Sequence, residues 1–398
     1  MILLAVAALG CGRFGFDPLS HGPGGDDGGF DPDAGPTPLA CSPVAETCNG
    51  LDDDCNGIVD DGCPCAPIDK TVNESPSSYT MQVAWTGSTL FMLEGDAATI
   101  EMWSVADGVL GPHVPVYSGA TGTVGTASFA WNGDKLGIAY EHDTKIVEFA
   151  TYDPVAMLMS TPMTIDPTYA GAGPHVIWVE DHFVVAWQTM NDGLVTREIS
   201  PAGTPLGPEQ LIVASTAGGI GAVWVTKTGT IACLRHRSDP SADLVVATAD
   251  GVQTLPLPIG GGLACDMLPI PGGYLAWYHT SQSDPVPLVF LDATGAVTST
   301  ATLPANPYID VAIQRLPNGF WVLASTTPAL YTHSTDELVL DAHGALVRGP
   351  TVLVDQLGAY LWSPPRTITT ATRTQASWSI NAGGAPSDYR IRETCGGS

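Results

Sequence analysis

An acidic loop at residues 48–63 holds the residue types and spacing most suited to binding a metal ion. Oxygen donors fall at positions 1, 3, 5, 7 and 9 of a calcium-loop pattern, and Gly57 falls at position 6, where such a loop turns sharply. Position 12 is Cys63, so Asp61 must replace the usual bidentate Glu. The candidate ligands are Asp52, Asp54, Asn56, Ile58 through its carbonyl, Asp60 and Asp61. We expect a weak calcium site, with a dissociation constant of about 10⁻⁴ to 10⁻³ M.

Cysteines surround this loop, and they are the most direct means of holding it. A segment as short and polar as residues 41–66 cannot build its own core, so disulfides must supply stability. We expect Cys48 to pair with Cys55, and Cys233 with Cys265. Cys395 would then pair with Cys41, Cys63 or Cys65, which leaves three alternatives open.

The acidic loop resembles a known motif. Residues 46–61, which read ETCNGLDDDCNGIVDD, are similar to the metal-binding motif of MopE-type outer-membrane proteins. That resemblance implies copper as the ligand. The donors themselves favour a hard cation, because copper prefers His, Met or thiolate ligands and the loop contains no His or Met. Calcium is therefore the first prediction and copper the second.

The N-terminal residues predict export and attachment to a membrane. Residues 1–10 are an apolar run that ends just before Cys11, and together they resemble a bacterial lipoprotein signal peptide with its acylated cysteine. The alternative is an ordinary secretory signal, which would release the protein. Residues 11–40 are rich in Gly, Pro and Asp and predict a disordered tether. We expect a lipid-anchored protein of the outer membrane or cell surface, or otherwise a secreted one.

Composition limits the class of partner. The chain has 398 residues and a net charge of −27, so an acidic surface would repel nucleic acid. Only 14% of residues are charged, while Gly (45) and Pro (33) are abundant. This mixture predicts many short strands joined by turns.

A repeat organises residues 78–398. An apolar run, a small polar turn and a second apolar run recur at Gly87, Gly133, Asp181, Gly229, Gly273 and Gly319, with spacings of 46, 48, 48, 44 and 46 residues. A second Gly-containing turn lies between most of them. Two hairpins in each period make four strands, which is one blade of a β-propeller. The sequence therefore predicts an all-β propeller of about seven blades, or alternatively six. A pair of β-sandwiches would not explain the even spacing.

No catalytic residue stands out in the sequence. It contains no GxSxG elbow, no HExxH pair, no P-loop and no dinucleotide fingerprint. We predict a module that binds a protein or glycan at one face of the propeller, where loops from several blades meet. The alternatives are an exported glycosidase or polysaccharide lyase with carboxylates at the axis, and a structural protein of the envelope.

Overall fold

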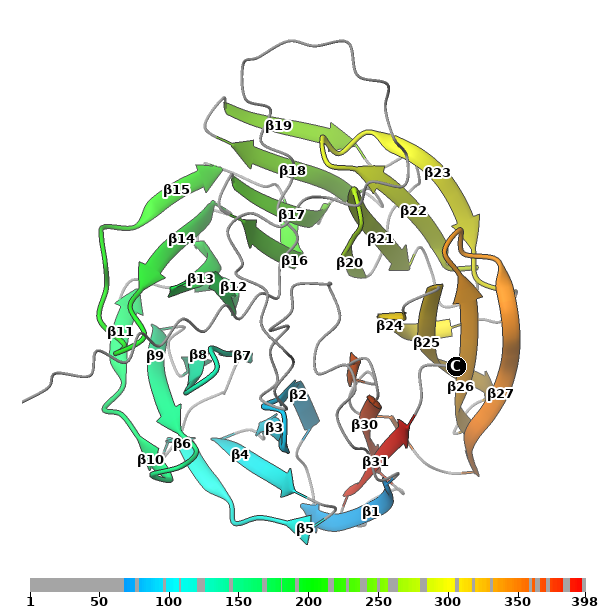
Figure 1. The fold of residues 1–398 in the computed structure, drawn as a ribbon, viewed down its shortest axis with the longest axis horizontal. Coiled ribbons are helices and arrows are strands. Elements are labelled where there is room, and N and C mark those ends of the chain that lie inside the picture. The colour runs from blue at the N-terminus through cyan, green and yellow to red at the C-terminus, as the bar shows by residue number, and fades with distance from the viewer. Residues whose placement is uncertain are drawn as a thin grey trace, which may run out of the picture.

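The fold is a ring of antiparallel β-sheets. The computed structural model describes residues 68–395, with gaps of at most seven residues between strands. The described residues form 31 strands in seven sheets of four or five strands each, and they include no helix, so none that could cross a membrane. Viewed along its shortest axis, the chain passes from sheet to sheet around the ring (Figure 1). The predicted all-β propeller is confirmed, and its first predicted blade number matches the seven sheets.

The first three blades follow one another along the chain, each from its innermost to its outermost strand. Blade 1 contains β2 (Tyr79–Trp85), β3 (Thr89–Gly95), β4 (Thr99–Ala106), β5 (Val109–Leu110) and β6 (Val114–Ser118). Blade 2 contains β7 (Ala127–Trp131), β8 (Leu136–His142), β9 (Ile146–Asp153), β10 (Leu158–Met159) and β11 (Met163–Asp166). Blade 3 contains β12 (Ala170–Val179), β13 (His182–Thr189), β14 (Leu194–Ile199) and β15 (Gln210–Val213).

The next three blades have four strands each. Blade 4 contains β16 (Gly218–Thr226), β17 (Gly229–His236), β18 (Ala242–Thr248) and β19 (Gly251–Pro256). Blade 5 contains β20 (Ala264–Ile270), β21 (Gly273–His279), β22 (Pro287–Asp292) and β23 (Val297–Thr302). Blade 6 contains β24 (Tyr308–Leu316), β25 (Gly319–Ala329), β26 (Thr332–Asp341) and β27 (Leu346–Leu357).

The last blade joins the two ends of the described chain. It contains β28 (Tyr360–Leu361), β29 (Arg366–Thr369), β30 (Arg373–Asn381) and β31 (Ser387–Cys395), and its outermost strand is β1 (Ile68–Ser75). β1 pairs antiparallel with β31, so backbone hydrogen bonds close the ring. The sequence boundary at residue 78 therefore omitted one strand, because a lone strand that completes another blade carries no repeat signal.

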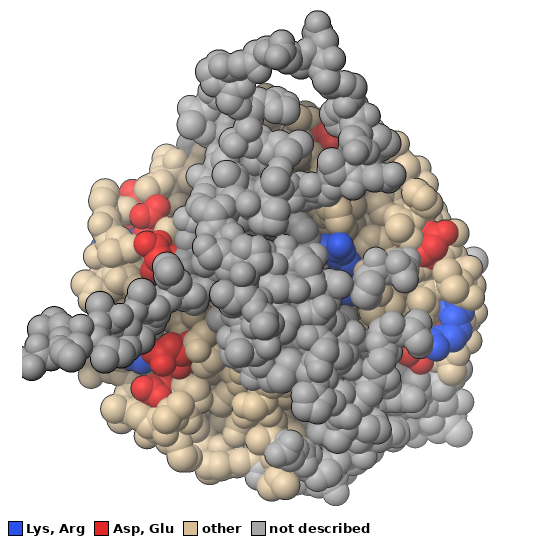
Figure 2. Space-filling view, viewed as in Figure 1, with Lys and Arg blue, Asp and Glu red and all other residues tan. Residues whose placement is uncertain are grey.

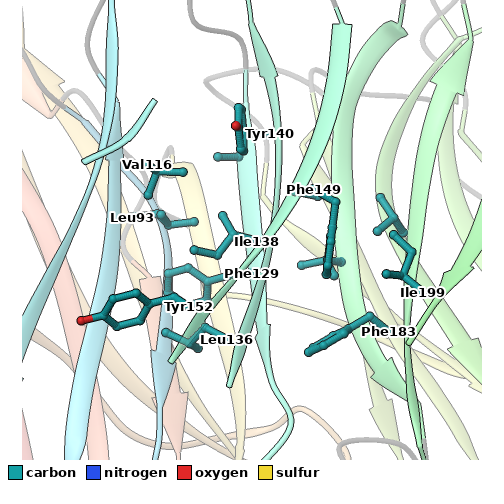
Figure 3. Packing of buried hydrophobic residues seen from close by; sticks show 14 of the residues in the cluster. Leu93, Val116, Phe129, Leu136, Ile138, Tyr140, Phe149, Tyr152, Phe183 and Ile199 are labelled. Atoms are coloured by element: carbon teal, nitrogen blue, oxygen red, sulfur yellow. The ribbon is translucent and has the colours of Figure 1, made fainter. Parts of the chain in front are cut away.

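The core lies in the seams between blades. One apolar cluster runs through blades 1, 2 and 3, and another fills the seam between blades 5 and 6. Figure 3 shows side chains of neighbouring sheets meeting in the first of these clusters, such as Phe149 of blade 2 and Phe183 of blade 3, whose rings lie 5.5 Å apart. The aromatic residues that the repeat placed near the ends of second strands, Tyr140, Trp187 and Trp277, are buried here.

Innermost strands are also joined across seams. The backbone N–H of Phe129 in β7 donates to Gln82 Oε1 of β2 at 2.5 Å. The N–H of Val176 in β12 donates to Ser128 Oγ of β7 at 2.6 Å. Each bond satisfies a donor at the inner edge of a sheet, where no further strand is present to accept it.

Candidate binding site

Most of the sequence-predicted site lies outside the described residues. This is true of Cys11, Cys48, Cys55, and the metal ligands Asp52, Asp54, Asn56, Ile58, Asp60 and Asp61. Calcium binding, lipidation and the Cys48–Cys55 pair therefore stay predictions. Within the described chain, no group of three or more His, Cys, Asp or Glu side chains is arranged to hold a metal ion.

Three of the candidate disulfide cysteines are on strands. Cys233 on β17 is completely buried and disulfide-bonded. Cys265 is on β20, the innermost strand of the next blade, which lies against β17. Cys395 ends β31, beside the start of β1. This arrangement is consistent with a Cys233–Cys265 pair, but the described side chains do not include that of Cys265, so the pairing stays a prediction.

Polar side chains gather in the seam between blades 1 and 2. The blade 1–2 cluster consists of Tyr117 on β6, Tyr140 and His142 on β8, and Glu148 on β9. The Tyr140 hydroxyl donates to Glu148 Oε2 at 2.7 Å, and His142 Nε2 lies 3.3 Å from the same oxygen. The ring of Tyr117 stacks on that of His142, with centroids 4.3 Å apart. Two blades thus share one carboxylate, one imidazole and two phenols.

Strand order explains why these four residues meet. His142 ends β8, and Glu148 lies near the start of β9, opposite Tyr140 in the antiparallel register. Tyr117 lies near the end of the outer strand of blade 1. Ends of second strands and of outermost strands lie on the same face of the ring, because alternate strands of a blade run in the same direction. We call this the cluster face.

The side chains of the blade 1–2 cluster differ in how much of their surface is exposed. Tyr140 is fully buried, the side chain of His142 is 11% exposed and that of Glu148 is 20% exposed. Burial raises the pKa of the Tyr140 phenol, and the hydrogen bond to Glu148 raises it further, so this hydroxyl remains a proton donor at physiological pH. The Glu148 carboxylate keeps part of its surface in water, where a polar ligand could reach it.

A second polar group lies in the seam between blades 2 and 3. The Trp187 indole N–H donates to Asp166 Oδ2 at 2.9 Å, and both residues are buried. Arg197 Nη1 donates to the Ile165 carbonyl at 3.0 Å and lies 3.9 Å from Glu209 Oε1. Burial raises the pKa of Glu209, Asp166 adds to this, and Arg197 opposes it. Asp166 is the last residue of β11, so it lies on the cluster face as well.

These contacts supply groups that a polar ligand can use. The described side chains of the two seams supply hydrogen-bond donors, carboxylates and aromatic rings, and the Tyr140 hydroxyl, which contacts the Glu148 carboxylate, is buried. On the face shown in Figure 2, carboxylates are spread over the blades at the left, where β9 to β15 lie in Figure 1. Sequence reasoning missed both clusters. The one available signal was a titratable pair, Glu141 and His142, at the end of the buried strand β8.

Comparisons with known proteins identify the fold but no family. No protein-family model and no curated protein match the chain. Among solved structures, a prolyl endopeptidase matches with a TM-score of 0.52 and 10% identity over 80% of this chain, and the match spans 50% of the enzyme's length.

Two further structures match along nearly their whole length. BBS1N in complex with ARL6DN matches with a TM-score of 0.52 and 10% identity, over 83% of this chain and 99% of that one. A Bacteroides fragilis protein described as a 6-phosphogluconolactonase matches with a TM-score of 0.50 and 14% identity, over 79% and 94%. Both enzymes and a protein that binds a partner thus share this architecture, and at such identity the likeness extends to the fold alone. The chain is a β-propeller.

Proposed function

We propose that this protein is an exported recognition module, which binds a protein or glycan ligand at the cluster face of its propeller. The blade 1–2 cluster carries this proposal. It offers a partly exposed carboxylate next to an imidazole and a phenol ring, which is the combination of hydrogen-bonding and apolar surface that polar ligands use. The seam between blades 5 and 6 packs mainly with apolar side chains, so two blades can be held together without such polar groups.

A binding screen with the full chain tests this proposal. Immobilised glycans and extracellular proteins would be screened with the unaltered protein and with Tyr117→Ala and Glu148→Gln variants. Loss of about 1.5–3 kcal/mol of binding free energy in Glu148→Gln, about tenfold to a hundredfold in Kd, is expected for a lost charge-assisted hydrogen bond. A matched control is Glu209→Gln, which lies in the other seam. Equal binding by all variants would contradict a site at this cluster.

The same screen separates recognition from catalysis. If the propeller is a glycosidase or lyase, polysaccharides would be cleaved and new reducing ends would appear during incubation. A recognition module binds and leaves its ligand unchanged. We therefore expect binding without an increase in reducing ends.

We also infer a lipid anchor and a calcium-type loop upstream of the ring. This inference rests on the lipoprotein-like run that ends at Cys11 and on the oxygen-donor spacing of residues 52–61. Cys11→Ser should abolish palmitate labelling and release the protein from membranes. In calorimetry, the full chain should bind calcium weakly, and Asp52→Asn with Asp54→Asn should abolish that heat. Binding of Cu²⁺ in place of calcium would overturn the choice of ion.

A further inference from the structure

The outermost strands of the seven blades differ in how they are protected against pairing with another chain. An outer edge strand exposes backbone N–H and C=O groups that a foreign strand can bind, and proteins usually guard such edges with charge, Pro, bulges or short strands. In blades 1 and 2 the outer edge is broken into two short strands, and in blade 3 it has only four residues. β27 has three register shifts and contains Pro350, and β1 carries Asp69, Lys70 and Glu74.

The outer edges of blades 4 and 5 carry less of this protection, with one proline at the end of β19 and one register shift near the start of β23. β19 reads GVQTLP and β23 reads VTSTAT, six residues each and without any charged side chain. β19 pairs with β18 along its whole length without a register shift, and β23 pairs with β22 with a shift only at its start. Five of the six residues in each strand are exposed. These regular, neutral edges lie next to each other on the rim of the ring (Figure 1).

Charge restricts what can pair with these edges. The two outer strands of blades 4 and 5 contain no Lys or Arg, and their charged residues are Asp243 of β18 and Asp292 of β22, one in each blade. The whole chain carries a net charge of −27, so a second copy would approach against strong repulsion. The uncharged middle of a partner strand would lie against the neutral edge. Basic residues on either side of that strand would lie close to the acidic protein around the edge.

The ring already uses strand addition once. β1 comes from the opposite end of the described chain and completes blade 7 by pairing with β31 from Ile68 to Ser75. We propose that the outer edges of blades 4 and 5 are a docking surface for an extended, uncharged segment of a partner protein that is flanked by Lys or Arg. Such a segment adds a fifth strand to the sheet through main-chain hydrogen bonds. This surface is separate from the cluster face and does not depend on it.

A designed peptide tests the docking surface on the full chain. The probe is a synthetic peptide with the sequence of β23 between lysines, and binding is followed by fluorescence anisotropy and by amide hydrogen exchange. We expect the peptide to slow exchange in β19 or β23. A control peptide with proline in place of a central residue has the same charge but cannot continue the ladder. It should bind at least about tenfold more weakly, as should a peptide flanked by glutamates.

Variants of the protein locate the edge. Gln253→Lys in β19 and Thr300→Lys in β23 place a guarding charge on each neutral edge and should together abolish the protection. The matched control, Val347→Lys, puts the same charge at an exposed position of the guarded strand β27 and should bind the peptide normally. The proposal is overturned if the proline peptide binds equally well, if no amide of β19 or β23 is protected, or if protection arises from self-association that grows with protein concentration.

Discussion

The seam between blades 5 and 6 and the seam between blades 1 and 2 are built on the same strand plan but filled differently. In the first, Phe290 and Phe320 pack at 6.0 Å, and the Trp277 indole finds a backbone carbonyl, that of Val311, at 3.2 Å. In the second, the hydroxyl of Tyr140 meets a carboxylate beside an imidazole. The apolar seam shows what is sufficient to hold two blades together. The polar groups of the other seam are therefore additions that binding can explain and packing does not require.

The largest expected effect is in the apolar seam. Phe320 is 3% exposed and packs among Leu, Val and Phe side chains of two blades. Phe320→Ala should lower the free energy of unfolding by about 4 kcal/mol, because it removes apolar contacts and leaves a cavity. Urea denaturation measures this loss. Tyr117→Ala, in the polar seam on a partly exposed ring, should cost clearly less, and an equal loss would mean that both seams serve stability alone.

The turns that enter the apolar seam provide the second test. Gly344 has a φ of +82°, and a Cβ placed there would lie 2.8 Å from Ala301 Cβ of the preceding blade. Gly344→Ala should therefore combine backbone strain with overpacking and cost about 3 kcal/mol. Gly251 occupies a related turn with a φ of +129° and open space around it. Gly251→Ala should show the backbone strain alone, about 1 kcal/mol in the same denaturation experiment. Equal losses would show that the blades do not pack closely at this turn.

These two turns also show how much of the fold could be predicted from the sequence. Turns recurring at a period near 46 residues predicted hairpins, blades and the ring, because several of their glycines, such as Gly87 and Gly133, have the positive φ that Gly adopts most readily. Strand β1 gave no such signal, since its partner β31 lies more than 300 residues away in sequence. Tyr117 also meets Tyr140 and His142 only through the packing of two blades. One sequence shows the residue types of that cluster but not their contact.

A change in the polar seam should have a smaller effect on stability than on binding. Tyr140→Phe removes the hydrogen bond to Glu148 and keeps the buried ring. We expect a loss of about 1 kcal/mol in unfolding free energy, because the partly exposed carboxylate can take up water instead. Tyr152→Phe is the control, since its ring lies in the same apolar cluster. If the cluster serves recognition, Tyr140→Phe should weaken ligand binding while Tyr152→Phe does not, and the reverse result would assign the hydroxyl to packing.

The smallest expected effect concerns acid stability at the turns of blades 5 and 6. Asp341 Oδ1 accepts the N–H groups of His343 and Ala345, both at 2.9 Å, and the Ala345 bond foremost lowers the pKa of Asp341 below its ordinary value of 3.8. For Asp292, burial raises the pKa, but hydrogen bonds from Thr294 and Ala296 outweigh it and lower the pKa below 3.8. A folded-state pKa below the unfolded one stabilises the fold above that unfolded value.

This stabilisation is lost as the pH falls through the lower, folded-state pKa of each group. Asp341→Asn with Asp292→Asn should therefore lower stability slightly at neutral pH, and the difference from the unaltered protein should disappear in strong acid. Thermal melting across a pH series measures it. Asp181→Asn is the matched control, because the Asp181 side chain is 90% exposed and accepts no backbone N–H bond recorded among the described residues. A difference that persisted at the lowest pH would show that Asn fails to reproduce the turn geometry. Shape and not charge would then determine how these two turns fit, as is expected for Gly344, which lies in the Asp341 turn.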